Sequence, residues 1–241
     1  MKPFSEGVPK RILLKISGEM LASAKGSFAH ASLEHIVSSI KATQADGIKE
    51  IGIVIGGGNL FRGRDAEHLQ LPPHITDRVG MLATCMNALI LREFLEMSGL
   101  PAVVMGDFLL HPNIDPFHVS HAKQALEAHQ IVIFANGLAQ PFFTTDTASV
   151  VRAQEIGADL LVKATKVPGV FDKDPFKHKD AIRYETLTYA EALKKKIEVM
   201  DDTAFCLLQK AKLPLFVFQF GHPLSLCKAL LQHECGTWVL S

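Results

Sequence analysis

The chain has 241 residues, and 48% of them are hydrophobic, which is enough for the core of one large domain or two small ones. Its 25 basic and 25 acidic residues cancel, so the composition argues against a broad nucleic-acid-binding surface, and nucleic acid is not an expected partner. No apolar run approaches the ~20 residues that a membrane helix needs, and residues 1–10 lack the apolar centre of a signal peptide, so we expect a cytoplasmic protein without a membrane span.

Apolar runs alternate with helical patterns along the chain. In chain order, the runs predicted to be strands lie at 12–16, 51–55, 102–105, 131–134, 159–163, 215–218 and 237–240. Apolar residues at spacings of three and four predict helices between them, at 33–47, at about 75–97, at 118–129, from near 146 onward, and on both sides of 215–218. The stretch 171–182 is rich in Lys, Asp and Pro and is predicted to be a loop.

These strands are apolar on both faces, which is typical of a mainly parallel central sheet covered by helices on both faces. We therefore predict an α/β three-layer sandwich. No repeat or long linker divides the chain, so residues 1–241 are expected to form a single domain, with two lobes on one continuous sheet at roughly 1–160 and 161–241. In such sheets ligands bind beyond the carboxyl ends of the strands, and the residues there are the candidates for a site.

A lysine and a glycine turn stand at the ends of the first two predicted strands. Lys15 lies in an apolar run where an unpaired ammonium group is costly to bury, so it either reaches solvent along its stem or faces an anion such as a transferring phosphoryl group. Gly56-Gly57-Gly58 either packs tightly or lets backbone N–H groups approach a phosphate. A helix starting just after it would add a positive end, and Arg62 could fork onto phosphate oxygens.

Polar residues also mark later points of the chain. Thr144-Thr145-Asp146 precedes a helical pattern and either caps that helix or binds a phosphate or base, with Asp146 serving a metal or a lysine. Asp77 could likewise be a helix cap or a ligand-binding residue. Asp174 lies in the lysine-rich loop, where such a residue is ordinary. The P-loop motif and the Gly-x-Gly-x-x-Gly fingerprint after the first strand are both missing, which disfavours a P-loop kinase and a dinucleotide-binding protein.

Six segments follow one another in a fixed order: Lys10–Glu19, Val54–Gly63, Gly80–Thr84, Pro141–Asp146, Lys163–Val167 and Val199–Asp201. Each is modest alone, but together they resemble the bacterial uridylate kinases of the amino-acid-kinase superfamily, from Lys10 to the C-terminus. The resemblance implies ATP-dependent phosphorylation of UMP to UDP in pyrimidine nucleotide biosynthesis, by direct in-line transfer with Mg²⁺ as the cofactor.

The resemblance also implies residue roles. It gives Lys15, Arg62, Asp146 and Lys163 as catalytic residues. It places ATP, mainly in the second lobe, against Lys15, Ile16, Ser17, Gly18, Gly58, Arg62, Thr165, Phe171 and Asp174. It places UMP, in the first lobe, against Gly57, Asp77, Leu138, Ala139, Gln140, Pro141, Phe142, Phe143, Thr144 and Thr145. No protein ligand to the metal is implied, because Mg²⁺ is expected to be held mainly by the nucleotide phosphates.

A homohexamer with GTP and UTP as effectors is implied as well. The chain departs from the family pattern at Gly26–His30, at Leu138-Ala139-Gln140, where contacts to the acceptor would be through the backbone, and at Pro168, where aspartate is usual. Two other interpretations stay open. One is a relative in the superfamily that phosphorylates a carboxylate, a carbamate or an isoprenoid phosphate, and the other is a nucleotide-binding regulator without catalysis.

Overall fold

A computed structural model describes residues 4, 7–63, 68–108, 111–197, 199–220, 226–232 and 236–241. The strands are β1 (Arg11–Ile16), β2 (Glu50–Ile55), β3 (Ala102–Gly106), β4 (Asp115–Pro116), β5 (Ile131–Phe134), β6 (Leu160–Thr165), β7 (Thr186–Thr188), β8 (Leu215–Gln219) and β9 (Gly236–Leu240). The helices are the 3₁₀ turn η1 (Gly18–Met20), α1 (His30–Ala45), α2 (Pro73–Met97), α3 (Val119–Glu127), α4 (Thr145–Ile156), α5 (Tyr189–Lys194), α6 (Asp202–Ala211) and α7 (Leu226–Gln232).

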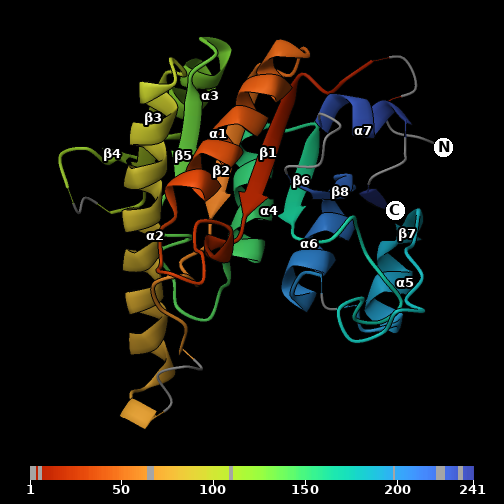
Figure 1. The fold of residues 1–241 in the computed structure, drawn as a ribbon. Helices are drawn as coiled ribbons and strands as arrows, with labels where there is room; N and C mark the ends of the chain where they lie inside the picture. The colour runs from red at the N-terminus through yellow and green to blue at the C-terminus, as the bar shows by residue number, and fades with distance from the viewer. Residues whose placement is uncertain are drawn as a thin grey trace.

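The strands form one sheet in the order β4-β3-β5-β2-β1-β6-β8-β9-β7 (Figure 1). The central strand β1 runs parallel to both of its neighbours, β2 and β6. Near one edge, β8 and β9 pair antiparallel, and β7 pairs parallel with β9. The predicted mainly parallel sheet is confirmed.

Helices cover both faces of the sheet, as the apolar strands predict. Side chains of β1 alternate between two core layers. Ile12, Leu14 and Ile16 pack in one layer with α1, α2 and α7, whereas Leu13 packs in the other layer with α3, α4, α5 and α6 (Figure 1). The three-layer sandwich is therefore confirmed. Because residues two apart in a strand share a face, Lys15 faces the same side as Leu13, toward α4.

The structure adds elements that the sequence pattern did not reveal. Each strand and helix predicted from the apolar patterns has a counterpart, and the loop at 171–182 holds no helix or longer strand. The short elements η1, β4, β7 and α5 were missed. The start of α5 carries a capping box, in which Thr188 Oγ1 accepts from the Glu191 N–H and the Glu191 carboxylate accepts from the Thr188 N–H. The helix behind this box has only 6 residues, too few to show a helical period.

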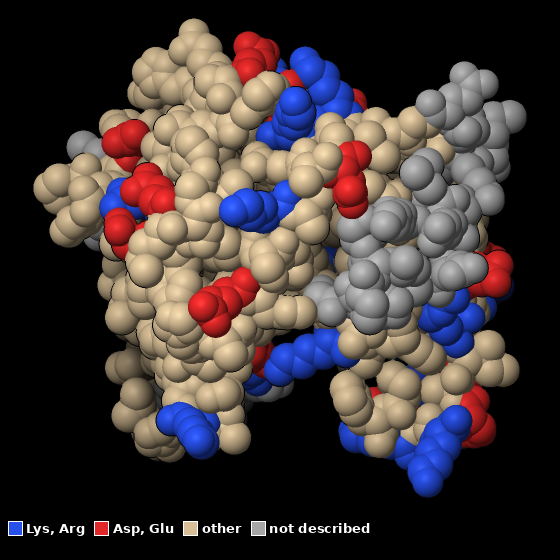
Figure 2. Space-filling model, turned by 45° about the horizontal axis from the view of Figure 1, so that its top comes forward, with Lys and Arg blue, Asp and Glu red and all other residues tan. Residues whose placement is uncertain are grey.

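The surface carries both signs of charge. On the face shown in Figure 2, lysines and arginines are interspersed with acidic residues and separated by uncharged areas, as the balanced composition suggests. Within the described residues, no helix combines the length and the apolar character needed to cross a membrane.

Candidate active site

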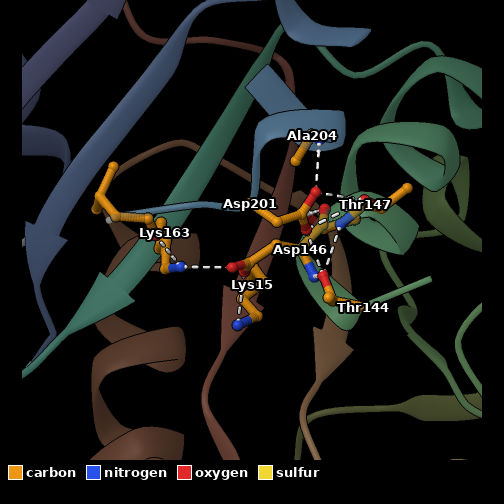
Figure 3. Close-up of polar contacts among 9 residues, drawn as sticks. Lys15, Thr144, Asp146, Thr147, Lys163, Asp201 and Ala204 are labelled. Atoms are coloured by element: carbon orange, nitrogen blue, oxygen red, sulfur yellow. Dashed lines mark hydrogen bonds and ion pairs between the residues drawn. The ribbon is translucent and has the colours of Figure 1, made fainter. Parts of the chain in front are cut away.

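Two lysines stand next to each other on the central strands of the sheet. Lys15 of β1 and Lys163 of β6 are register partners in a parallel pair, and both side chains lie on the α4 face (Figure 3). Lys15 is buried, and the Lys163 side chain is only 13% exposed. Like charges on adjacent strands repel, so this arrangement requires a negative partner.

Asp146 supplies that partner from the first turn of α4. Its Oδ1 lies 2.7 Å from Lys15 Nζ and its Oδ2 lies 2.8 Å from Lys163 Nζ, so one carboxylate is shared by two ammonium groups (Figure 3). The three groups together carry one net positive charge when all are ionised. The cluster is therefore suited to hold two lysines in place and still attract an anion.

Burial and neighbouring charges shift the pKa values in this cluster. Burial alone would raise the pKa of Asp146, but the ammonium groups of Lys15 and Lys163 outweigh it and lower that pKa below its usual value. Burial, followed by the positive charge of Lys15, lowers the pKa of Lys163 to about 8, although Asp146 and Asp201 oppose the shift. Lys163 can thus change its charge close to neutral pH.

The helix start at Thr144-Thr145-Asp146 is confirmed, and the structure adds a carboxylate to it. Thr144 Oγ1 caps α4 by accepting from the N–H groups of Asp146 and Thr147, at 3.0 and 3.3 Å. Asp201 accepts from the Ala204 N–H at 2.8 Å and also from the hydroxyls of Thr144 and Thr147 (Figure 3). Asp201 therefore ties the first turns of α4 and α6 together beside the lysines.

Lys163 has a further partner that the residue assignments missed. Its Nζ donates to the carbonyl of Val199, just before the α6 cap. Val199 and Asp201 lie in one of the six matching segments but received no role. Their contacts form only when distant segments come together in the fold. The only signal in the sequence was that Val199–Asp201 is one of the six matching segments.

The glycine turn lies directly against the end of β1. Gly56 N–H donates to the carbonyl of Ile16 at 2.9 Å, and a Cβ on Gly18 would lie 2.5 Å from the Gly56 carbonyl oxygen. Lys15 and the triple glycine therefore share one end of the sheet. Within the described residues, the N–H groups of Gly57 and Gly58 donate to no backbone carbonyl, which leaves two donors for a ligand.

The expected helix just after the glycine turn is wrong. The N–H groups of Leu60 and Phe61 close a single turn on the Gly57 carbonyl, both at 3.0 Å, and the next α-helix of the described residues begins only at Pro73. Pro72 and Pro73 place that start, because proline is favoured where helix N–H groups have no partner. The positive N-terminal end of a helix therefore does not follow directly after the three glycines.

Arg62 lies beside the glycine turn but is held by an acidic residue. Its Nε donates to the Gly58 carbonyl at 3.0 Å, and its guanidinium group forms an ion pair with Glu19 of η1. Glu19 also lies 3.9 Å from Lys166 Nζ. Glu19 received no role from the sequence, because nothing in its local pattern indicates that it reaches Arg62 across the site.

A pocket of about 160 Å³, here called the Asp77 pocket, lies between the glycine turn and α2. Its lining includes the predicted residues Gly57, Asp77, Leu138, Phe143 and Thr145. Of the other predicted residues, Ala139, Gln140, Pro141, Phe142 and Thr144 lie outside the lining. Asp77 is not a helix cap, since it follows the first turn of α2 and its Oδ2 accepts from the Phe142 N–H at 2.8 Å.

A larger pocket of about 520 Å³, here called the Phe171 pocket, lies next to Lys163. Lys163, Thr165, Phe171 and Asp174 all line it, as do Lys195 and Lys196 beyond α5. The other residues predicted to bind ATP lie outside its lining: Lys15, Ile16, Ser17, Gly18, Gly58 and Arg62. The Ile16 side chain is fully buried in the core, so only its backbone is available to a ligand. Lys163 lines this pocket while Thr145, next to Asp146, lines the other, so the charge cluster joins the two.

Known proteins resemble the chain over almost its whole length. The model of the amino acid kinase family matches residues 10–219. The uridylate kinase of Legionella pneumophila (strain Corby) is 46% identical over 95% of this chain and 94% of its own length. The uridylate kinase of Thermosipho melanesiensis is 41% identical over 96% and 98%. Among solved structures, UMP kinase from Bacillus anthracis superposes with a TM-score of 0.90 at 37% identity, covering 96% of both chains.

Proposed function

The chain belongs to the amino acid kinase family, and we propose that it transfers the γ-phosphoryl group of ATP to the phosphate of UMP, forming UDP and ADP in pyrimidine nucleotide biosynthesis. The observation that carries the proposal is the Lys15–Asp146–Lys163 cluster, which joins two pockets next to a glycine turn with open N–H groups. Bringing two phosphates together requires such concentrated positive charge.

The proposed mechanism is a direct in-line transfer without a covalent enzyme intermediate. An oxygen of the UMP phosphate forms a bond to the γ-phosphorus while the bond from that phosphorus to the β,γ-bridging oxygen breaks, and ADP leaves with the electron pair. The attacking oxygen is already anionic, so no strong general base is needed. Lys15, Lys163, Arg62 and the glycine N–H groups neutralise the phosphates, and Asp146 keeps the two lysines in position.

The two pockets support the proposed division of the substrates. UMP is assigned to the Asp77 pocket and ATP to the Phe171 pocket. The residues that line the first lie between positions 57 and 145, and those that line the second lie between 163 and 199. This supports an acceptor lobe at roughly 1–160 and an ATP lobe at roughly 161–241 on one sheet.

Magnesium enters this proposal as part of the Mg-ATP substrate. Within the described residues, His, Cys, Asp and Glu side chains do not gather in groups of three that could hold a metal, and both oxygens of Asp146 are paired with lysines. We therefore assign the ion to the nucleotide phosphates, where it neutralises charge when bound.

Detection of UDP tests the function. The full chain is incubated with Mg-ATP and UMP, and products are separated by chromatography, with CMP, glutamate and aspartate as parallel acceptors. We expect ADP and UDP in equal amounts with UMP. Phosphorylation of glutamate or aspartate instead would indicate another activity of the family, and no ATP consumption with any acceptor would favour a regulator without catalysis.

Asp77→Asn is expected to raise the KM for UMP about tenfold and to leave the KM for ATP within twofold. The carboxylate is a stronger acceptor for sugar hydroxyls than an amide, and the difference is about 1–1.5 kcal/mol. The amide oxygen can still accept from the Phe142 N–H, so the loop that Asp77 holds is retained. Saturation curves for both substrates measure the effect, and an unchanged UMP curve contradicts the assigned role.

Activity is expected to fall above about pH 8, where Lys163 loses its proton. Because the ammonium form is needed, kcat/KM for ATP should drop tenfold per pH unit beyond that point. The effect on stability has the opposite sign. Between about pH 8 and the ordinary lysine pKa of ~10.4, Lys163 is protonated in the unfolded chain but largely neutral in the folded one. The free energy of unfolding therefore increases as pH rises through this range.

The Lys163→Arg variant is the control for this pH profile, since a guanidinium group stays charged throughout the range. We expect its activity, whatever the absolute level, to lack the alkaline fall. A fall with the same midpoint in both proteins would assign it to another group.

We also propose a homohexamer in the cytoplasm, with GTP and UTP as effectors. The α2 helix supports subunit contacts, because Leu82, Met86 and Met97 are 45%, 52% and 78% exposed on it and would be covered by another copy. The effectors are proposed from the family resemblance alone, and no residue of this chain is assigned to them.

A further inference from the structure

A buried amide on α2 holds the glycine turn. Asn87 is fully buried, and its Nδ2 donates to the Gly56 carbonyl and to Asn59 Oδ1, both at 2.7 Å. Asn59 Nδ2 in turn donates to Asn87 Oδ1 at 3.1 Å and to the Ser27 carbonyl at 2.9 Å. All four N–H bonds of the two amides therefore have acceptors.

This choice of residue is unexpected for packing alone. Ala83 and Leu91, one turn away on either side of Asn87, are apolar members of the core, and an apolar residue at 87 would continue the same stripe. Burying an amide costs free energy unless each polar atom is satisfied. The asparagine is thus explained by the turn that it binds.

Two elements lie against the turn. Asn87 holds the Gly56 carbonyl from α2, and η1 packs closely on the same group, since a Cβ on Gly18 would meet Asn59 Oδ1 and the Gly56 oxygen, both at 2.5 Å. In a planar trans peptide the carbonyl and the following N–H point in opposite directions. Anchoring the Gly56 carbonyl on Asn87 therefore also fixes the direction of the Gly57 N–H.

We propose that Asn87 is a positioning residue for phosphoryl transfer, which orients the open N–H groups of the glycine turn through the Gly56 carbonyl; this rests on the proposed function. The same helix carries Asp77 and lines the Asp77 pocket at Gly80, Met81 and Thr84. Asn87 therefore couples the position of the glycine turn to that of the proposed UMP pocket. A misplacement of about 1 Å at a reacting group can lower a rate about 10²-fold.

The Asn87→Asp variant tests the proposal. It keeps the shape of the side chain and an acceptor for Asn59, but it replaces the donor to the Gly56 carbonyl with an oxygen. We expect kcat to fall 10–100-fold while the KM values for UMP and ATP stay within about threefold, because the turn is displaced but the nucleoside contacts remain. Tyr189→Phe is the matched control, since it also removes a buried hydrogen bond, to the Leu213 carbonyl, and its kcat should stay within twofold.

The wild-type enzyme is assayed for UDP in the same series. If the proposed function is wrong, the wild-type enzyme itself forms no UDP, which distinguishes that outcome from a failure of the role of Asn87. A folded Asn87→Asp protein with kcat within twofold of wild type overturns the positioning role. If this variant does not fold, Asn87→Ser is measured with the same criterion, since its hydroxyl is too short to replace the direct hydrogen bond. Equal loss of kcat in Tyr189→Phe would also overturn the proposal, because a general loss of stability would then explain the effect.

Discussion

Replacement of Lys15 by alanine is expected to lower turnover at least about 10²–10³-fold while the fold persists. The ammonium group of Lys15 is buried on the central strand, beside the glycine turn, where it faces the phosphates of the proposed reaction. Removing one preorganised positive group from such a site costs about 3–4 kcal/mol of transition-state stabilisation. Asp146 keeps Lys163 as a partner, so no buried charge is left alone.

The Lys15→Met variant separates charge from packing. Methionine fills nearly the space of the lysine stem and lacks the charge, so it should be as inactive as alanine and closer to wild type in the free energy of unfolding. Steady-state kinetics and chemical unfolding are measured on all three proteins. Near-normal turnover in a folded Lys15→Ala protein would rule out the assigned role, and recovery of turnover in Lys15→Met would show that packing explains the loss.

The sequence predicted which residues gather at this site, and the physical reason is simple. Parallel strands bring their carboxyl ends to one edge, so the polar residues that follow buried runs must gather there. Lys15, the triple glycine and Asp146 were identified in this way, and the structure brings them together. A lysine inside an apolar run is costly without a partner, which already pointed to a carboxylate or a phosphate.

Which of these side chains contact one another could not be predicted from the local sequence. That Lys15 and Lys163 are neighbours depends on the register between β1 and β6, which are separated by more than a hundred residues. The contacts of Val199 and Asp201 with α4 and Lys163 likewise depend on how α6 packs against α4. The ion pair between Glu19 and Arg62 joins η1 to the segment after the glycine turn. In each case the local pattern gives the residue type, and only the tertiary arrangement gives its partner.

Asp146→Asn is the second variant with a large expected effect, on both stability and activity. The amide leaves two buried ammonium groups next to each other without the carboxylate that they share, and loss of one partner from a buried ionic cluster costs about 3–5 kcal/mol. Turnover should fall at least about 10²-fold, since the lysines are then no longer held in position. Unfolding in denaturant and UDP formation measure the two effects.

The pH dependence of Asp146→Asn has a defined sign. The carboxylate raises the pKa of Lys163 in the native protein, so without it that pKa falls below about 8. At low pH both lysines of the variant are charged, and their repulsion lowers the free energy of unfolding in full. As pH rises and Lys163 loses its proton, the repulsion ends, so part of the lost stability should be recovered. A stability difference from wild type that is constant between pH 6 and 9 contradicts this account.

A double variant, Asp146→Asn with Lys163→Met, distinguishes the two consequences of losing the carboxylate. Removing one ammonium group ends the repulsion with Lys15, so the free energy of unfolding should rise above that of Asp146→Asn. Activity should not return, because two of the three charged groups that join the pockets are then missing. Recovery of UDP formation together with stability would mean that Asp146 acts only in folding, and that the shared carboxylate does not organise the lysines for phosphoryl transfer.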